Sequence, residues 1–313
     1  MSGQTIPLRL SLRALRAFTA TVEQGSISGA AQALNVAPSA ISALLDQVEA
    51  EFGATLLVRS RARGVVATAE GRRMAGRFRL LLEDYAEIIE DGHEIAKGMR
   101  GTLRVGYYAP VGPAFLPGIL TPLMHANPGL RLDLQETDND TVQERLLSGD
   151  LDVILFAGQD MRAGIETHPL LDLPPYVLVP AGHPLATNDR TTLNDVSHYP
   201  LIELNRPLAR PYVSRLFSDR KLSPEVVARA NTTEMVRSLV GAGLGIAILA
   251  MRPQTHISYA GDPLRALPLD PGLPRLQLLS GKIPGQNRRL VSAFMDALHG
   301  WANSPSALDF SVR

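Results

Sequence analysis

The residues with the clearest capacity for chemistry lie between Pro38 and Gln47. At helical spacing, one face of this stretch carries short side chains opposite an apolar stripe: Ser39, Ser42, Ala43, Asp46 and Gln47. Small polar groups presented on a helix can meet base edges and phosphates in the major groove of duplex DNA. The pattern therefore predicts a surface that contacts nucleic acid.

A run of arginines follows directly. From Arg59 to Arg79 the chain has seven arginines and one acid, although its 31 basic and 31 acidic residues cancel overall. Residues 56–58 and 65–67 are predicted to be short strands of a β-hairpin. The tip of that hairpin presents Arg59, Arg61 and Arg63. Guanidinium groups placed in this way suit a phosphate backbone or a minor groove.

Three short helices are predicted to position these groups, because apolar residues recur at helical spacing over residues 12–22, 28–34 and 41–52. Residues 35–37 form a turn, and Pro38 suits a first helical position because it lacks an N–H group. The second and third helices then form a helix-turn-helix pattern. Three small helices that pack on something else are the alternative, and the arginine hairpin behind them favours DNA binding.

A long helix is predicted from Glu70 to about Gly98. Its apolar residues alternate spacings of four and three, as in the heptad seam of a coiled coil. The seam consists of Met74, Phe78, Leu81, Tyr85, Ile88, Gly92 and Ile95. A two-fold DNA site needs two reading heads, so we expect this helix to join two copies of the chain. The alternative is a helix that packs along its own C-terminal domain.

Proline separates the first hundred residues from the rest, because residues 1–100 hold only two of the 23 prolines. The remainder must consist of short elements joined by turns. Residues 103–156 predict a βαβαβ order, and hence a parallel sheet that binds ligands at the carboxyl ends of its strands. A second α/β unit is predicted over residues 176–249, with a return to the first unit near residue 276.

These residues together resemble the LysR-type transcriptional regulators. The matching runs are Leu15-Arg16-Ala17-Phe18, Glu23-Gln24-Gly25-Ser26-Ile27-Ser28, Ala30-Ala31, Pro38-Ser39-Ala40-Ile41-Ser42, Phe52-Gly53, Arg63-Gly64-Val65 and Glu70-Gly71. The resemblance covers essentially the whole chain. It implies an α/β multidomain protein that binds double-stranded operator DNA and responds to a small-molecule effector.

The resemblance also implies the domain organisation. A winged helix-turn-helix domain is expected over residues 1–69 and a dimerising linker helix over residues 70–100. A two-lobed effector domain of the periplasmic-binding-protein type (type 2) is expected over residues 101–313. Lobe I would comprise about 101–174 and 276–313, and lobe II about 175–275. The protein would act in the cytoplasm as a homodimer or homotetramer.

By position in the family, the DNA contacts fall on three elements. Pro38, Ser39 and Ser42 would enter the groove, Arg59, Arg61 and Arg63 would form the wing, and Ser26 and Ser28 would approach phosphates. This sequence departs from the family at Ala43, where a longer polar side chain is usual, and at Asp46, which adds a negative charge. Ala37 also lacks the capping oxygen of a Ser or Thr, a loss of about 1 kcal/mol.

The effector is expected in the cleft between the lobes, since ligand sites favour domain interfaces. The residues expected to line it are Tyr107, Tyr108, Pro110, Phe156, Gly158, Asn205, Arg206, Thr232 and Thr233. Thr232 and Thr233 begin a predicted helix, whose free N–H groups favour an anion. Ala109 and Pro110 stand where the family often has Ser or Thr, so the two tyrosines favour a more apolar or aromatic ligand.

Other functions find little support in the residues. The chain has no cysteine, and its seven histidines are scattered without a metal-binding spacing, so no cofactor, metal site or enzymatic activity is expected. No apolar run approaches the length of a membrane span, and the N-terminus lacks the layout of a signal peptide. The alternatives are a solute-binding protein or an enzyme on the same two-lobed fold, neither of which would bind DNA.

Overall fold

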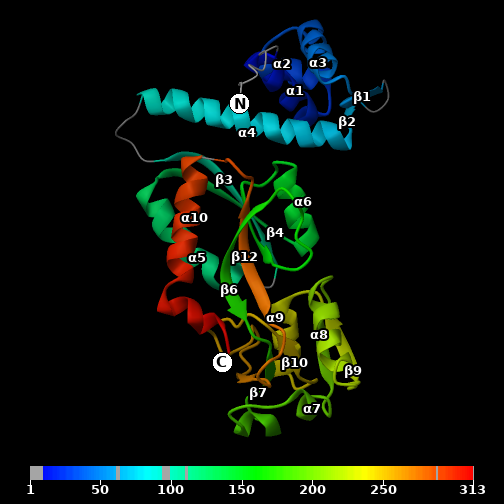
Figure 1. The fold of residues 1–313 in the computed structure, drawn as a ribbon, viewed down its shortest axis with the longest axis vertical. Coiled ribbons are helices and arrows are strands. Elements are labelled where there is room, and N and C mark those ends of the chain that lie inside the picture. Colours follow the sequence, from blue (N-terminus) through cyan, green and yellow to red (C-terminus); the bar gives the residue numbers. More distant parts are fainter. Residues whose placement is uncertain (1–9, 61–63, 94–98, 110–111, 287, 313) are drawn as a thin grey trace, which may run out of the picture. The chain divides into compact units, whose positions relative to one another are not determined.

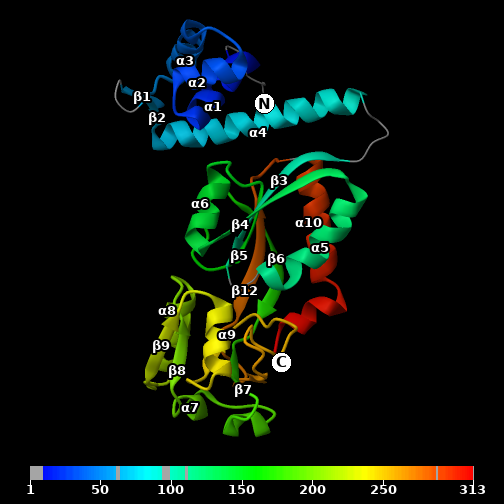
Figure 2. The ribbon, with the colours of Figure 1, turned by 180° about the vertical axis from the view of Figure 1, so that it is seen from behind.

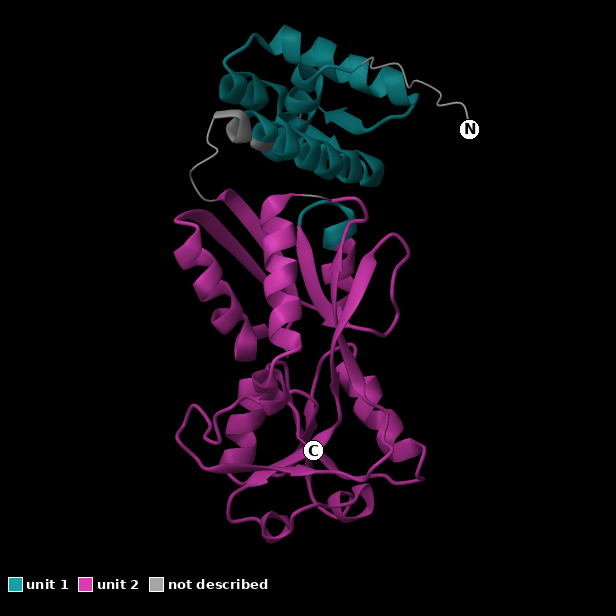
Figure 3. Cartoon of the chain, turned by 60° about the vertical axis from the view of Figure 1, so that its left-hand side comes forward, with its two compact units in different colours: residues 1–97, 145–151 teal, residues 98–144, 152–313 magenta. Residues whose placement is uncertain are grey.

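The computed structural model describes residues 10–60, 64–93, 99–109, 112–286 and 288–312 (Figure 1). The chain divides into two compact units (Figure 3). The first comprises residues 1–97 with 145–151, and the second comprises residues 98–144 with 152–313. Each unit has a hydrophobic core of its own.

The first unit consists of short helices, a hairpin and a long helix. Its elements are α1 (Leu12–Gln24), α2 (Ile27–Leu34), α3 (Pro38–Phe52), β1 (Leu57–Ser60), β2 (Gly64–Ala67) and α4 (Ala69–His93). The Ser11 hydroxyl accepts the Ala14 N–H group at the start of α1, and Gly25 ends this helix at a φ of 64°. Glycine suits this left-handed conformation because it has no Cβ.

The apolar faces of α1, α3 and α4 form the core of the first unit. The ring centroid of Phe78 on α4 lies 5.6 Å from that of Phe18 and 6.1 Å from that of Phe52. Phe78 is buried, and Met74 packs against the same cluster. Full burial of such a side chain contributes about 1.5–3 kcal/mol. The prediction that Phe78 and Met74 belong to a dimer seam is thus corrected, because the first turns of α4 face their own domain.

The hairpin β1–β2 is fastened to the corner between α1 and α2. The Val65 N–H group donates to the Gly25 carbonyl at 2.8 Å. Gly64 has a φ of 71°, and a Cβ atom there would lie 2.5 Å from the Gly25 oxygen. Only glycine fits this contact, which brings the hairpin close to the helix-turn-helix.

In the second unit, lobe I is a mixed sheet with helices on both faces (Figures 1 and 2). Its strands, in the order β4-β3-β5-β12-β6, are β4 (Gly129–Thr137), β3 (Arg100–Tyr108), β5 (Val153–Ala157), β12 (Leu276–Lys282) and β6 (Glu166–Leu173). β3 pairs in parallel with β4 and β5, as the βαβαβ pattern predicts, whereas β12 is antiparallel to both its neighbours. The helices are α5 (Gly112–Ala126) and α10 (Arg289–Ala302) on one face, α6 (Asn139–Leu147) on the other, and the short η2 (Pro305–Phe310).

Lobe II is built on two small sheets. β7 (Tyr176–Pro180) lies between β10 (Ala247–Leu249) and β11 (Leu264–Pro268), and β8 (Leu201–Leu204) pairs in parallel with β9 (Val226–Ala230). The helices are η1 (Pro184–Thr187), α7 (Leu193–Val196), α8 (Ala209–Ser218) and α9 (Thr233–Gly241). The chain passes from lobe I to lobe II between β6 and β7 and returns between β11 and β12.

A buried ion pair anchors the returning chain in lobe I. Arg288, just before α10, donates to Asp152 at 2.8 Å. The second carboxylate oxygen of Asp152 accepts the Arg104 N–H group at 2.8 Å. Asp152 is fully buried, so these hydrogen bonds replace the water that its charge would otherwise require.

Candidate functional site

The helix-turn-helix presents the short side chains to solvent. Ile41, Leu45 and Val48 of α3 are 0% exposed in the core. On the other face Pro38, Ser39, Ala43 and Asp46 are exposed, with Ser42 partly buried. α3 therefore has one face packed in its own domain and one exposed face.

The start of α2 lies at the edge of this surface. The Ser26 hydroxyl caps α2 by accepting the Gly29 N–H group at 3.0 Å, and Ser28 is exposed two residues further on. Ala30 and Ala31 are buried where α2 meets α1 and α3, because small side chains allow the helices to approach. Ser26 thus has a capping role in addition to the predicted phosphate contact.

Arg59, which is predicted to belong to the wing, forms ion pairs with α3. Its guanidinium donates to Asp46 at 2.6 Å and to Glu49 at 3.3 Å. The other Glu49 oxygen accepts the N–H groups of Leu56 and Leu57 at 2.7 and 2.9 Å. Arg59 thereby neutralises Asp46, whose charge lies on the side of α3 that the sequence predicts to face DNA. Arg61 and Arg63 lie outside the described residues.

The second half of α4 carries an exposed apolar row. Leu81, Tyr85, Ile88 and Ile89 are 49%, 47%, 68% and 46% exposed. The first three belong to the predicted heptad seam, whereas Ile89 was not predicted. Ile95, the last predicted residue, lies outside the described residues. Apolar side chains this exposed on one helix are typical of a surface that another chain covers.

A cavity of about 420 Å³ opens between the two lobes of the second unit. Lobe I contributes Ala109, Pro113, Ala114 and Glu136, and lobe II contributes Arg206, Asn231, Thr232, Thr233, Glu234, Arg237, Pro253 and Tyr259. Ala109 and Glu136 stand at the carboxyl ends of β3 and β4, where an α/β sheet binds ligands. The two carboxylates and two guanidinium groups in this lining cancel in formal charge.

Arg206 joins the two lobes beside this cavity. Its guanidinium lies 3.2 Å from an Asp138 oxygen and 3.5 Å from a Glu136 oxygen, both in lobe I. Tyr107 also faces Glu136, and its pKa is raised by burial first and by that carboxylate second. The end of β4 is therefore an anionic corner that Arg206 partly neutralises.

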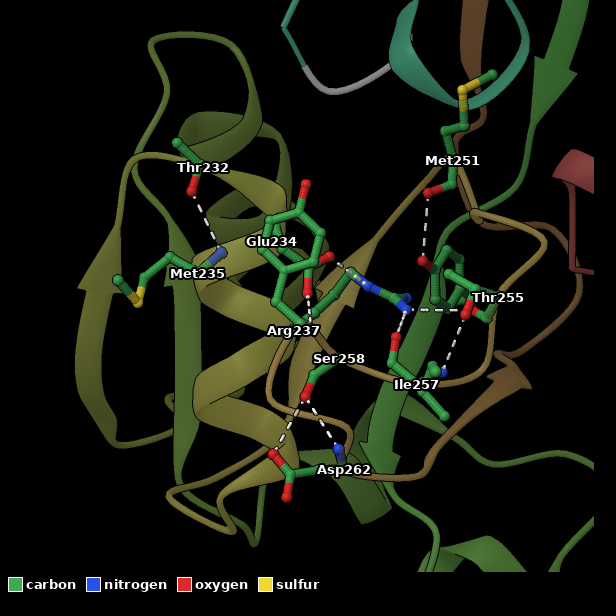
Figure 4. Close-up of polar contacts among 11 residues, drawn as sticks. Thr232, Glu234, Met235, Arg237, Met251, Thr255, Ile257, Ser258 and Asp262 are labelled. Carbon is green, nitrogen blue, oxygen red and sulfur yellow. Dashed lines mark hydrogen bonds and ion pairs between the residues drawn. The ribbon is translucent and has the colours of Figure 1, made fainter. Parts of the chain in front are cut away.

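Arg237 organises the lobe II wall of the cavity (Figure 4). It is 1% exposed, and its Nε donates to Glu234 at 3.0 Å. Its Nη2 donates to the carbonyls of Thr255 and Ile257 at 3.1 and 2.6 Å. The second Glu234 oxygen accepts the Tyr259 N–H group at 2.7 Å. These bonds hold the segment that carries the exposed Tyr259 ring at the cavity.

Several predicted cleft residues lie elsewhere. Tyr108 is 1% exposed in the lobe I core, where burial raises its pKa; it does not line this cavity, but it lines a smaller one with Leu204 and Thr233 of lobe II. Phe156 is fully buried in β5 and packs beside Gly281. Gly158 lies against Gln277 and Leu279 of β12. Consecutive strand residues point to opposite faces, so Tyr107 and Tyr108 do not face the same pocket, and the aromatic ligand inferred from them stays a prediction.

The other residues predicted to line the cleft lie in or next to the cavity, or outside the described residues. Arg206, Thr232 and Thr233 line the cavity, whereas Asn205 bonds to the lining residue Asn231 at 3.0 Å. Pro110 lies outside the described residues. Glu136, Arg237 and Tyr259 were missed. Glu136 alone had a signal, its place at the end of a predicted strand.

The described residues contain no group of three or more His, Asp or Glu side chains arranged to hold a metal ion. Among the helices in the described ranges, none combines the length and apolar character that crossing a membrane requires.

Comparison with known proteins connects both sites to one class. Residues 12–72 match the family described as bacterial regulatory helix-turn-helix protein, lysR family, and residues 96–303 match the LysR substrate binding domain. The transcriptional regulator AlsR of Bacillus subtilis is 28% identical over 76% of this chain and 79% of its own. The hydrogen peroxide-inducible genes activator of Dickeya chrysanthemi is 29% identical over 85% of this chain and 91% of its own.

Solved structures of LysR-family regulators have the same fold as this chain. HinK, a LysR family regulator from Pseudomonas aeruginosa, superposes with a TM-score of 0.61 at 27% identity and covers 94% of this chain and 100% of its own. A full-length OxyR from the same organism has a TM-score of 0.70 at 24% identity, covering 93% of this chain and 98% of its own, and shows the shared fold.

A helix-turn-helix unit joined to a two-lobed ligand-binding unit defines a ligand-responsive transcriptional regulator. The chain belongs to the LysR family, so the predicted resemblance is confirmed, and it is a DNA-binding regulator with an effector-binding domain. Regulators of this family bind operator DNA and small-molecule effectors and form oligomers. The relatives are transcriptional regulators rather than enzymes, and nothing supports the alternative of a solute-binding protein.

Proposed function

We propose that two copies of the chain, joined through α4, present their α3 helices to successive major grooves of an operator in the cytoplasm. A small molecule in the interlobe cavity then changes operator affinity by shifting the population of lobe arrangements. The observation that carries the DNA contact is the two-faced α3, with Ile41, Leu45 and Val48 fully buried and Ser39 and Ala43 exposed opposite them.

A charge substitution tests the DNA contact. Ser39→Glu places a carboxylate where α3 would approach the bases and phosphates, and we expect it to abolish retention of genomic fragments in a gel-shift or affinity capture assay. Ser214→Glu makes the same change at an exposed position of α8 in lobe II and should leave retention intact. If both variants bind DNA like the unsubstituted protein, α3 is not the reading element.

The dimer contact is proposed for the exposed row on α4. Burying Leu81, Tyr85, Ile88 and Ile89 against the same residues of a second copy removes apolar surface from water on both chains. Ile88→Glu introduces paired charges into that contact, and sedimentation should show dissociation toward monomers. Unchanged sedimentation would assign the contact to another surface. A tetramer, as two such dimers, predicts a second step at higher protein concentration.

The effector proposed for the cavity is a small molecule with an apolar body and at least one polar end. The volume of about 420 Å³ lies within the usual range for small-ligand sites. Pro113, Ala114 and Pro253 offer apolar contact, while Asn231 and Thr233 offer polar groups. Thermal-shift screening of metabolites would identify it, because a ligand that binds only the folded state raises Tm. Thr233→Phe should fill the cavity and remove that shift.

A further inference from the structure

Arg206 makes ion pairs that cross from one lobe to the other. It follows β8 in lobe II, and its partners Glu136 and Asp138 lie at the end of β4 in lobe I. All three side chains are partly exposed, at 19%, 42% and 36% for Arg206, Glu136 and Asp138. The contact is therefore accessible to a ligand that enters the cavity, which Arg206 and Glu136 both line.

The hydrogen bonding of Arg206 is incomplete. Its pairs at 3.2 and 3.5 Å are longer than the 2.7–2.9 Å typical of a charge-assisted hydrogen bond. Its Nε is buried and has no hydrogen-bond partner among the described residues. A guanidinium offers five N–H groups in a planar fork that matches a carboxylate in two parallel bonds. Arg206 thus retains capacity for a better acceptor than its present partners.

Arg237, the other guanidinium in the lining, is bound differently. Its acceptors Glu234, Thr255 and Ile257 all belong to lobe II, and it is 1% exposed. A ligand that took these bonds would dismantle the wall of the cavity, whereas a ligand that took those of Arg206 would only separate two lobes. The two arginines therefore have distinct parts, one in the wall and one at the junction.

We propose that Glu136 and Asp138 are resident counter-ions that hold Arg206 while the cavity is empty, and that an effector carboxylate replaces them and so releases the lobes from each other. This rests on the proposed function, in that the cavity is taken as the effector site. The effector class is a carboxylate on a small apolar body, because Arg206 supplies the fork and the neighbouring Pro113, Ala114 and Pro253 supply apolar contact. The interlobe contact Arg206–Glu136–Asp138 is named the clasp.

The clasp explains how a cavity of balanced charge can recognise an anion. Removing two carboxylates from Arg206 leaves their charges at the edge of β4, where they are partly exposed to water. The cost of exchange is therefore modest, since exposed ion pairs contribute little. An effector binds only when Arg206 is free, so its apparent Kd is the intrinsic value divided by the free fraction.

The first experiment measures the clasp without a ligand. The chain has no cysteine, so Ser292→Cys on α10 and Ser214→Cys on α8 place one spin label on each lobe at exposed positions. Dilution with unlabelled protein restricts the pulsed EPR distances to single subunits. The full-length double variant Glu136→Gln, Asp138→Asn keeps side-chain shape but removes both charges, and we expect a broader and longer distance distribution.

Two further variants keep this experiment decisive. Arg206→Gln breaks the clasp from lobe II and should give the same broadening, so a folding defect in one variant cannot decide the outcome. Arg220→Gln removes an exposed arginine just after α8, away from the clasp, and should leave the distances unchanged. If the distances of the Glu136→Gln, Asp138→Asn protein coincide with those of the unsubstituted protein, the clasp does not exist.

The second experiment tests the exchange with phenylacetate and its neutral analogue phenylacetamide as probes. Phenylacetate should broaden the interlobe distances of the unsubstituted protein, and phenylacetamide should not. The Glu136→Gln, Asp138→Asn variant should bind phenylacetate about tenfold more tightly, as expected if the clasp leaves Arg206 free about a tenth of the time. Equal binding of acid and amide, or no binding of phenylacetate to that variant, would overturn the exchange.

The outcomes separate this inference from the proposed function. A screened effector that Thr233→Phe excludes, but that leaves interlobe distances unchanged, would retain the cavity as the effector site and remove the clasp exchange. Broadening in the clasp variants, with phenylacetate binding that Thr233→Phe does not affect, would retain the clasp and move the effector site elsewhere.

Discussion

The charge on the side of α3 that is proposed to face DNA provides the sharpest test of the recognition surface. Asp46, Glu49 and Arg59 form a group with a net charge of −1, because one guanidinium neutralises one of two carboxylates. Asp46→Ala raises that sum to zero. Glu49 stays fixed by the N–H groups of Leu56 and Leu57, so the hairpin keeps its attachment to α3. We expect tighter DNA binding with little change in stability.

The magnitude follows from exposure and charge. The side chains of Asp46 and Arg59 are 65% and 35% exposed, and exposed pairs contribute about 0.2–1 kcal/mol, so unfolding should shift by less than about 1 kcal/mol. For DNA, one additional phosphate neutralised steepens the slope of log K against log salt by about 0.9. A fourfold fall in salt concentration then strengthens binding by about 3.5-fold more in the variant than in the unsubstituted protein.

Fluorescence anisotropy with a mixed-sequence duplex measures this slope, because non-specific binding rests on phosphates and needs no known operator. The control is Glu51→Ala, which removes one exposed carboxylate about 140° around the same helix. Its slope should change much less. Equal slopes for Asp46→Ala and the unsubstituted protein, or equal changes in both variants, would refute the placement of Asp46 against DNA.

Three further predictions concern stability. Gly64→Ala should destabilise the protein by more than Gly53→Ala in thermal unfolding. Both glycines have a positive φ, where a Cβ atom costs about 1–2 kcal/mol, but of the two only the Cβ atom at position 64 would also meet a backbone oxygen. Equal losses would contradict the contact. Burial lowers the pKa of His183, whose neutral ring caps η1. The stability that this ring contributes is therefore present above pH 6.5 and is lost as the pH falls through the lower pKa of the folded state. His183→Asn should remove this pH dependence of Tm in thermal melts. Arg288→Met should cost about 1–3 kcal/mol, because it removes the closest charged partner of the buried Asp152 while the Arg104 guanidinium stays at 3.8 Å, and chemical denaturation showing a loss below about 1 kcal/mol would refute it.

The sequence predicted elements well where local patterns determine structure. The helices at 12–24, 27–34 and 38–52 follow from apolar spacing, a glycine stop and Pro38, and all of these signals are local. The strands β6 and β11 were not predicted. β6 contains Pro169 and a register shift against β12, and it lies at the sheet edge, where a strand shows little regular alternation. Its place depends on a partner more than a hundred residues further along the chain.

The functional residues were likewise predicted where a local pattern places them and missed where a long-range contact does. Ser39, Ala43 and Asp46 were predicted as a face because helical spacing assigns faces. The pairing of Asp46 with Arg59 depends on how the hairpin folds back, and no spacing rule gives that. The seam on α4 was predicted as one continuous dimer surface. Phe78 instead contacts Phe18, because α1 packs against the first turns of α4. Arg237 and Tyr259 had no local signal, because their role arises only when a distant loop returns to α9.

The attachment of the hairpin has a consequence for altering the protein. The bonds that assemble the first unit, from Gly25 to Val65 and from Glu49 to Leu56 and Leu57, use backbone groups or a side chain on the flank of α3. Ser39 and Ala43 take no part in these bonds. The positions proposed to read a sequence are therefore exchangeable without rebuilding their support, and retargeting the protein to a new promoter becomes a problem of choosing a few surface side chains on an unchanged frame.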